Sequence, residues 1–412
     1  MTEKYGLVLE GGGAKGSYEI GACKALDEIG IQIAAVTGTS VGALNGAMIA
    51  QHEIEKAYKL WHNIHPSQIM KVDEKKLKQL TNLEIKPDDL SYYLKMIGEI
   101  ITERGIDVTP LKKLIKEYVD EDKLRKSDID FGMVTVSFSD RKALELFVED
   151  IPEGKVADYL FASANYPLFR SAKIDEKIYL DGGVYDNLPI QMLFKKGYRS
   201  FITIQVGGIG RKRKVNLENC EVINIEPNES LGGPLNFNAE KARENLKLGY
   251  FDAYRVLKKL SGQIYYIKLE QQEEYFIDYF SNLDGEIIKK VAQTLNLKAD
   301  IPYSRLLFEK VLPKLVEVLK LPEDCDYGDI ALSLAEKIAA ELGVERFKIY
   351  TFDELIDCIT KEFSKQKKRN SKKERSLISK FGFLSLFSRD NVLKKLVQDL
   401  LDEKIINTLK DA

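Results

Sequence analysis

The stretch GLVLEGGGAKGSYEIGA, residues 6–22, decides the fold of the N-terminal part of this chain. Residues 5–9 are mostly apolar and predict a buried strand, three glycines follow, and a helix is expected to begin near Gly16. The same order then repeats, because 33–37 predicts a strand and 41–51 a helix of small residues. Strands that alternate with helices predict an α/β fold with a mostly parallel central sheet flanked by helices.

The pattern along the rest of the chain predicts two domains. Further strands of the same sheet are expected at three apolar runs, 131–138, 201–207 and 221–227. Residues 52–130 predict a mostly helical insertion, and the sequence after 260 shows amphipathic helical periods without strand patterns. We therefore expect an α/β domain over 1–260 and a helical C-terminal region over 261–412.

Composition limits the classes of partner and the compartment. The 412 residues carry a net charge of −2, so no overall field attracts nucleic acid, and none is expected as a partner. The four cysteines lie far apart, which favours free thiols in a reducing compartment over a disulfide framework. Neither a leader pattern nor an apolar run of about 18 residues is present. We expect a cytoplasmic protein whose contact with a membrane, at its inner face, is at most peripheral.

The three glycines fit several kinds of site. Gly11, Gly13 and Gly16 satisfy the dinucleotide-binding pattern GxGxxG, which also needs an acidic residue at the end of the second strand. That strand ends instead in Gly-Thr-Ser, at Ser40, so the missing carboxylate disfavours a dinucleotide. A phosphate loop needs lysine after its last glycine, whereas Lys15 precedes Gly16. Nucleotide binding is therefore the least favoured interpretation.

A nucleophile explains the glycines better. The sequence GTSVG at 38–42 matches GxSxG at a strand-to-helix junction, where Gly38 and Gly42 allow the sharp turn that exposes the Ser40 hydroxyl. A serine nucleophile produces an anionic tetrahedral intermediate, which backbone N–H groups stabilise when glycines allow close approach. The glycine loop at 11–16 is therefore interpreted as an oxyanion hole.

The base that would activate Ser40 cannot be a histidine in the usual chain order. All three histidines, His52, His62 and His65, precede the later acidic candidates, so the order Ser, Asp, His is impossible. The segment KIYLDGGVYDNLPI, 177–190, offers Asp181 as the leading base and Asp186 as a rival. Because an ordinary carboxylate is a weak base, we expect either a buried Asp181 with a raised pKa or a turn that stabilises the alkoxide.

The motifs GGGAKG, GTSVG and DGG, in this order, resemble the patatin-like phospholipase family. The resemblance extends over roughly residues 5–260, with softer matches at 161–169 and 236–253. It implies a three-layer α/β core and a Ser–Asp dyad without histidine. It also implies a lipid acyl hydrolase of phospholipase A type that works through an acyl-enzyme and needs neither metal nor cofactor.

The resemblance assigns roles to residues of this chain. Ser40 would be the nucleophile and Asp181 the proton acceptor. Oxyanion donors would come from the backbone at Gly11, Gly12, Gly13 and Val41. Supporting positions would be Lys15, Gly38, Gly42, Gly182 and Gly183, with DGG in place of the commoner DGA. Lys15 either steers an anionic head group or is simply a solvated lysine.

Two alternatives and one surface remain open. The same dyad would serve a general esterase or acylglycerol lipase, and a lipid-binding scaffold with a vestigial site is a third class. The stretch 365–376 carries seven basic residues in twelve and leads into an aromatic segment, 381–387. The whole of 365–388 is therefore a candidate for peripheral contact with an anionic bilayer. A solvated linker followed by a packed helix is the alternative.

Overall fold

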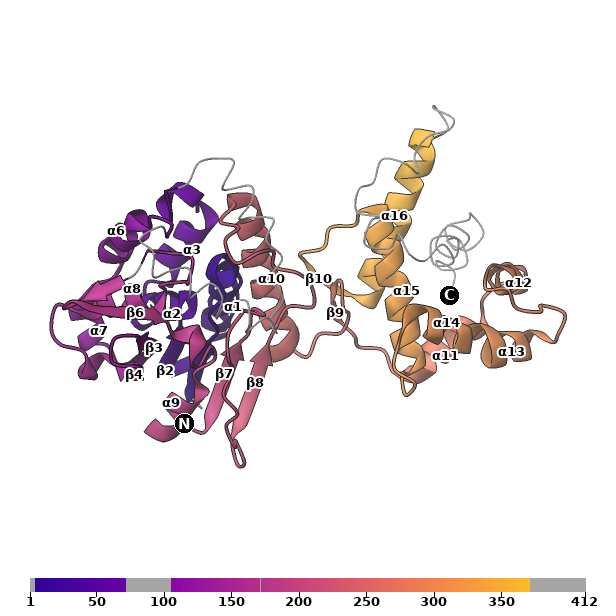
Figure 1. The fold of residues 1–412 in the computed structure, drawn as a ribbon. Coiled ribbons are helices and arrows are strands. Elements are labelled where there is room, and N and C mark those ends of the chain that lie inside the picture. Colours follow the sequence, from indigo (N-terminus) through magenta and orange to yellow (C-terminus); the bar gives the residue numbers. More distant parts are fainter. Residues whose placement is uncertain (1–3, 72–104, 171, 371–412) are drawn as a thin grey trace. The chain divides into compact units, whose positions relative to one another are not determined.

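The computed structural model describes residues 4–71, 105–170 and 172–370 of the chain. The chain divides into two compact units, Met1–Lys258 and Lys259–Ala412 (Figure 1). The boundary predicted from the sequence lies at residue 260. Part of the predicted helical insertion, and residues 371–388 of the candidate membrane segment 365–388, lie outside the described residues.

The N-terminal unit is built on a sheet of eight strands among its described residues. Their order is β5-β6-β3-β2-β1-β7-β8, with β4 paired to β3. The strands are β1 Lys4–Leu9, β2 Gln32–Thr39, β3 Asp130–Ser137, β4 Lys142–Phe147, β5 Ala172–Ile174, β6 Lys177–Asp181, β7 Ser200–Ile204 and β8 Glu221–Ile225. The five strands predicted from the sequence, β1, β2, β3, β7 and β8, pair in parallel. The predicted α/β fold is confirmed, whereas the antiparallel strands β4, β5 and β6 were not foreseen.

Helices cover both faces of this sheet and give it three layers. They are α1 Gly16–Ile29, α2 Val41–Ala50, α3 Ile54–His62, α6 Thr109–Tyr118, α7 Glu121–Arg125, α8 Val156–Ser163, α9 Ile190–Lys196 and α10 Ala239–Leu257. On one face Gly46 of α2 lies against Val36 of β2 and Phe131 of β3. On the other face Val8 of β1 belongs to an apolar cluster with Leu193 of α9. Alternate residues of the central strands are therefore buried on opposite faces, as the near-continuous apolar runs indicated.

Strands β2 and β6 share the same edge of β3. Along β3, Val134 pairs with Thr39 at the end of β2, and the next residue, Thr135, pairs with Asp181 at the end of β6. The other edge of β3 is taken by β4. Because β2 runs parallel to β3 and β6 runs antiparallel to it, their carboxyl ends meet head to head. This arrangement brings the residue after β2, Ser40, next to Asp181.

The C-terminal unit is mainly helical. Its helices are α11 Glu273–Ser281, α12 Gly285–Thr294, α13 Tyr303–Leu306, α14 Leu312–Leu319, α15 Tyr327–Leu342 and α16 Phe352–Asn370, with a π-helical turn at Leu307–Val311. They bury an apolar core that includes Phe276, Leu307 and Phe352. The expectation of no strands was wrong, because β9 Tyr266–Lys268 and β10 Ile349–Thr351 form a parallel pair. Three-residue strands are too short to show a period in the sequence. Within the described part of the chain, no helix has the length and apolar character needed to cross a membrane.

Candidate active site

Ser40 lies on a strained turn between β2 and α2. Its backbone has φ 56° and ψ −124°, a conformation that costs free energy for any residue with a side chain. The turn closes tightly around two glycines, since a Cβ atom on Gly38 would lie 2.3 Å from the carbonyl carbon of Gly42. The Ser40 side chain is consequently held at the carboxyl edge of the sheet, above the N-terminus of α2, as a GxSxG nucleophile turn requires.

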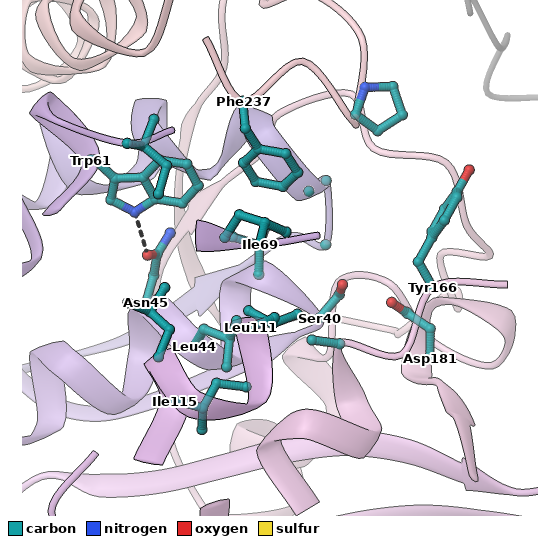
Figure 2. A pocket seen from close by; sticks show the side chains of 18 of the residues that line it. Ser40, Leu44, Asn45, Trp61, Ile69, Leu111, Ile115, Tyr166, Asp181 and Phe237 are labelled. Carbon is teal, nitrogen blue, oxygen red and sulfur yellow. Dashed lines mark hydrogen bonds between the residues drawn. The ribbon is translucent and has the colours of Figure 1, made fainter. Parts of the chain in front are cut away.

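Asp181 ends β6 and faces Ser40. The hydroxyl of Ser40 and the carboxylate of Asp181 point toward each other at one end of a pocket (Figure 2). Asp181 is only 5% exposed, and its Oδ1 accepts a hydrogen bond of 2.8 Å from the Gly183 N–H. Burial raises the pKa of Asp181 to about 6, against the opposing effect of hydrogen bonds from the Ser40 side chain and the Gly183 N–H. The buried position and raised pKa of Asp181 agree with the first of the two expectations for this residue.

The end of α8 supports both residues. Ser163 Oγ accepts a 3.0 Å hydrogen bond from the Ser40 N–H, which fixes the turn at Ser40 against the helix. The Asn165 carbonyl accepts a 3.2 Å hydrogen bond from the Asp181 N–H. Ser163 and Asn165 had no role in the sequence analysis, although both lie in the softly matching stretch 161–169. The soft match over 161–169 was the sequence signal that pointed to this region. The contacts of Ser163 and Asn165 with Ser40 and Asp181 could not be predicted, because local patterns do not reveal which distant residue a side chain contacts.

In the glycine loop, one predicted oxyanion donor, the Gly11 N–H, already has a hydrogen-bond partner. The N–H of Gly11 donates a 3.1 Å hydrogen bond to the carbonyl of Asn187, so it is occupied within the fold. Gly11 is therefore removed from the set of candidate oxyanion donors. Among the described residues, no acceptor faces the N–H groups of Gly12, Gly13 or Val41. These three groups stay available for an anion.

Lys15 and the rival base have other partners. The Lys15 amine donates a 2.7 Å hydrogen bond to the Gly207 carbonyl, and burial lowers its pKa. Asp186 is buried and its pKa is raised to about 6 by burial, yet its carboxylate accepts from the backbone N–H groups of Leu188 (3.3 Å) and Arg213 (3.4 Å). The pocket is lined by neither residue nor by any histidine. Asp186 is therefore not brought to Ser40.

The pocket runs from Ser40 and Asp181 along α2 and encloses about 1080 Å³, including the part open to solvent. Its wall is mainly apolar and includes Leu44, Met48, Leu111, Ile115, Ile69 and Phe237. Asn45 is a polar side chain in the wall, and its amide donates a 2.7 Å hydrogen bond to the Glu19 carboxyl. The Asn45 side-chain oxygen accepts a 2.9 Å hydrogen bond from the Trp61 indole (Figure 2). Burial raises the pKa of Glu19 well above its usual range, which favours the neutral form of this carboxyl. The long axis of the pocket therefore suits an apolar chain.

A family model described as patatin-like phospholipase matches residues 7–194 of the chain. That range includes the glycine loop, Ser40 and Asp181. Residues 7–194 form a patatin-like phospholipase domain. The resemblance inferred from the three motifs is thus confirmed, and membership of this family supports a lipid-hydrolase activity for the patatin-like domain.

Known relatives match parts of the chain. Patatin-like phospholipase domain-containing protein 7 of Rattus norvegicus is 27% identical over 204 residues, which is 49% of this chain and 13% of the relative. Lysophospholipase nte1 of Aspergillus terreus is 56% identical over 46 residues, 11% of this chain and 3% of the relative. The chain thus matches a small part of each relative's length. Among solved structures, VipD from Legionella pneumophila aligns over 98% of this chain and 91% of its own, with 16% identity and a TM-score of 0.39.

Proposed function

We propose that the patatin-like domain is a serine-dependent lipid acyl hydrolase of phospholipase A type. One observation carries the proposal: Ser40, on a strained turn, faces the buried Asp181 at one end of a long apolar pocket. A nucleophile, a base of raised pKa and an acyl-sized pocket are the parts that ester hydrolysis of a lipid requires. A general esterase or acylglycerol lipase would use the same parts and differ in its preferred ester.

Acylation begins when Ser40 Oγ attacks the ester carbonyl carbon. Asp181 accepts the hydroxyl proton on the carboxylate oxygen that does not bind the Gly183 N–H. Negative charge develops on the carbonyl oxygen, and the free N–H groups of Gly12, Gly13 and Val41 stabilise it. The tetrahedral intermediate then collapses, the bond to the alcohol breaks, and Asp181 returns the proton to the leaving alcohol or lysophospholipid.

Deacylation repeats these steps with water as the nucleophile. Asp181 takes a proton from the water as its oxygen attacks the acyl-enzyme, and that proton returns to Ser40 when the fatty acid leaves. A carboxylate of pKa about 6 suits both directions of transfer near neutral pH. The chemistry needs neither a metal ion nor a cofactor.

The pocket gives the acyl chain a defined place. From Ser40 to Met48, α2 advances by about 12 Å, at about 1.5 Å per residue. An acyl chain bound along this wall would leave the head group at the end of the pocket where Ser40 and Asp181 lie. Binding energy from the chain would then orient the ester at Ser40.

The test is release of fatty acid from mixed phospholipid vesicles by the wild type, Ser40→Ala, Asp181→Asn and Asp186→Asn. Release should vanish in the first two variants and persist in Asp186→Asn, whose carboxylate lies outside the pocket. Release that persists in Asp181→Asn would refute the dyad. A reactive phosphonate ester that labels the wild type but not Ser40→Ala would exclude a vestigial site.

Membrane contact and location are further parts of the proposal. We infer that 365–388 assists peripheral binding to an anionic bilayer at the inner face of a membrane, with the protein otherwise cytoplasmic. The support is the basic and aromatic composition of this segment. Co-sedimentation with anionic vesicles should weaken on deletion of 365–388, and unchanged co-sedimentation would remove this part.

A further inference from the structure

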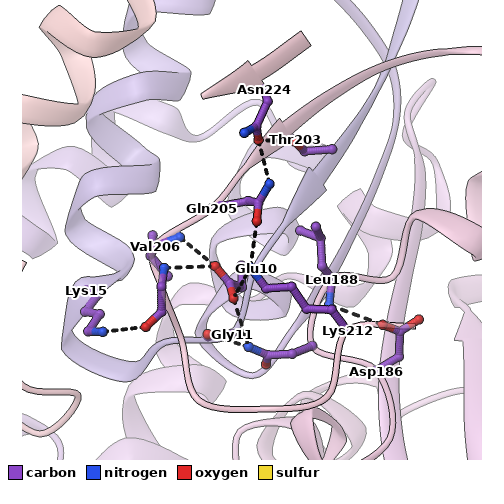
Figure 3. Close-up of polar contacts among 12 residues, drawn as sticks. Glu10, Gly11, Lys15, Asp186, Leu188, Thr203, Gln205, Val206, Lys212 and Asn224 are labelled. Carbon is purple, nitrogen blue, oxygen red and sulfur yellow. Dashed lines mark hydrogen bonds and ion pairs between the residues drawn. The ribbon is translucent and has the colours of Figure 1, made fainter. Parts of the chain in front are cut away.

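Glu10 is a fully buried carboxylate between β1 and the glycine loop. Its Oε2 accepts hydrogen bonds from the backbone N–H groups of Val206 (2.7 Å) and Gly207 (3.0 Å). Its Oε1 lies 3.0 Å from the Lys212 amine and accepts a 3.4 Å hydrogen bond from the Asn187 amide (Figure 3). A buried charge is tolerated only where such partners replace water. The proposed reaction of Ser40 and Asp181 gives no role to Glu10 or to the four donors that surround it.

Three of the four donors to Glu10, from Val206, Gly207 and Lys212, belong to the covering segment, residues 206–212 after β7, whose Ile209 lines the pocket. This covering segment lies directly on the glycine loop, because a Cβ atom on Gly208 would be 1.6 Å from the carbonyl oxygen of Gly11. Its other end lies on the turn that follows Asp181, where the Arg211 N–H donates a 2.9 Å hydrogen bond to the Gly183 carbonyl. The position of the covering segment therefore fixes both the glycine loop and the turn after the base.

Asn187 links the same parts a second time. Its side-chain amide donates to the Gly11 carbonyl (3.0 Å) and to Glu10, and its backbone carbonyl accepts the Gly11 N–H (3.1 Å). Its own N–H donates to the Arg211 carbonyl (2.7 Å). Gly11 is thereby held on both its N–H and its carbonyl. The two glycines that follow it project from an immobilised residue.

The charge of Glu10 requires compensation at this position. The carboxylate directly precedes Gly11, and an unbalanced negative charge there would repel the oxyanion that forms at the neighbouring N–H groups. Lys212 supplies the balancing positive charge at 3.0 Å. A second amine, that of Lys15, binds the Gly207 carbonyl in the covering segment. The buried carboxylate can therefore organise the loop without opposing the reaction.

We propose that Glu10, with its charge balanced by Lys212, is a positioning residue that holds the Gly12 and Gly13 N–H groups where the oxyanion forms. The inference rests on the proposed acyl-hydrolase function. It assigns Glu10 a role in kcat, through the geometry of the oxyanion hole, in addition to any contribution to stability.

Three variants test the assignment: Glu10→Gln, Lys212→Met and the double variant. In Glu10→Gln one oxygen can still accept from Val206 and Gly207, but the new NH₂ group opposes the donors of Lys212 and Asn187. A displacement of the order of 1 Å can cost about 100-fold in rate, so kcat on a soluble p-nitrophenyl ester should fall by about tenfold to 100-fold, with KM within about twofold. Lys212→Met should also lower kcat, because it leaves the buried carboxylate unbalanced. Joining both changes removes one of the two opposed donors, that of Lys212, so the double variant should be faster than Glu10→Gln.

Lys155→Met is the matched control, since Lys155 is a half-exposed lysine whose partner, Asp175, lies on an exposed turn. It should retain the wild-type kcat. Fluorescence of Trp61, the single tryptophan, shows whether each variant is folded at the assay temperature.

The outcomes separate the two proposals. A folded Glu10→Gln with wild-type kcat, or a double variant as slow as Glu10→Gln, would overturn the positioning role while the acyl-hydrolase function stood. A wild type that neither hydrolyses esters nor labels at Ser40 would instead refute the function and the inference together.

Discussion

Replacing Asp181 by Asn should stabilise the patatin-like domain while it abolishes activity. The carboxylate is buried, and burial raises its pKa from 3.8 to about 6. The folded state thus holds this proton more tightly than the unfolded chain does. The stabilisation from protonated Asp181 is complete below about pH 3.8 and is lost as the pH rises through about 6. Asn cannot ionise and avoids this loss, and its oxygen can still accept from the Gly183 N–H.

The magnitude follows from the two pKa values of Asp181. At about 1.36 kcal/mol for each pH unit between them, ionisation costs the wild type about 3 kcal/mol of unfolding free energy at pH 7.5. At pH 4.5, where the folded protein is largely protonated, the corresponding cost is about 1 kcal/mol. The stability difference between Asp181→Asn and wild type should therefore grow by about 2 kcal/mol over this range. Any pH-independent effect of the substitution cancels in that comparison.

Urea unfolding at several pH values measures this difference. Trp61, the single tryptophan, is buried in the pocket wall, so its fluorescence follows unfolding of the patatin-like domain alone. Ser40→Ala is the control, because it should be equally inactive yet retain the carboxylate and a pH-dependent stability. A difference between Asp181→Asn and wild type that is the same at pH 4.5 and 7.5 would refute the reasoning.

Three further predictions concern the reaction itself. Because Asp181 must be ionised to accept a proton, kcat/KM should fall about tenfold per pH unit below pH 6, and a flat profile from pH 5 to 8 would contradict its role as base. Gly13→Ala places a Cβ atom 2.2 Å from the Pro234 carbonyl oxygen at φ +59°, so kcat should fall by about 100-fold or more; Gly30→Ala, also at positive φ but with open space around it, should leave kcat unchanged. Met48→Trp should shorten the pocket and shift the preference of kcat/KM from long to short acyl esters, and an unchanged ratio would show that the chain binds elsewhere.

Local patterns in the sequence determined the turn at Ser40 and the order of the main elements. The period of apolar residues predicts β1, α1, β2 and α2, because strand and helix repeats are properties of neighbouring residues. Gly38 marks the turn at Ser40, since a side chain there would collide with the backbone of Gly42, four residues further along the chain. The Asp-Gly-Gly turn singled out Asp181 in the same way. What these patterns share is that their cause lies within a few residues.

Packing between distant segments brings some of these groups together and gives others hydrogen-bond partners within the fold. Asp181 reaches Ser40 because β6 runs antiparallel along the same edge of β3 as β2, beyond the point where β2 ends, a pairing between distant segments with no local signature. In the folded chain the Gly11 N–H is hydrogen-bonded to the Asn187 carbonyl. Glu10 accepts hydrogen bonds from a loop almost two hundred residues further along the chain. Sequence patterns reveal the conformations that nearby residues favour, whereas hydrogen-bond partners and the charges that balance a buried carboxylate depend on which distant strands lie side by side.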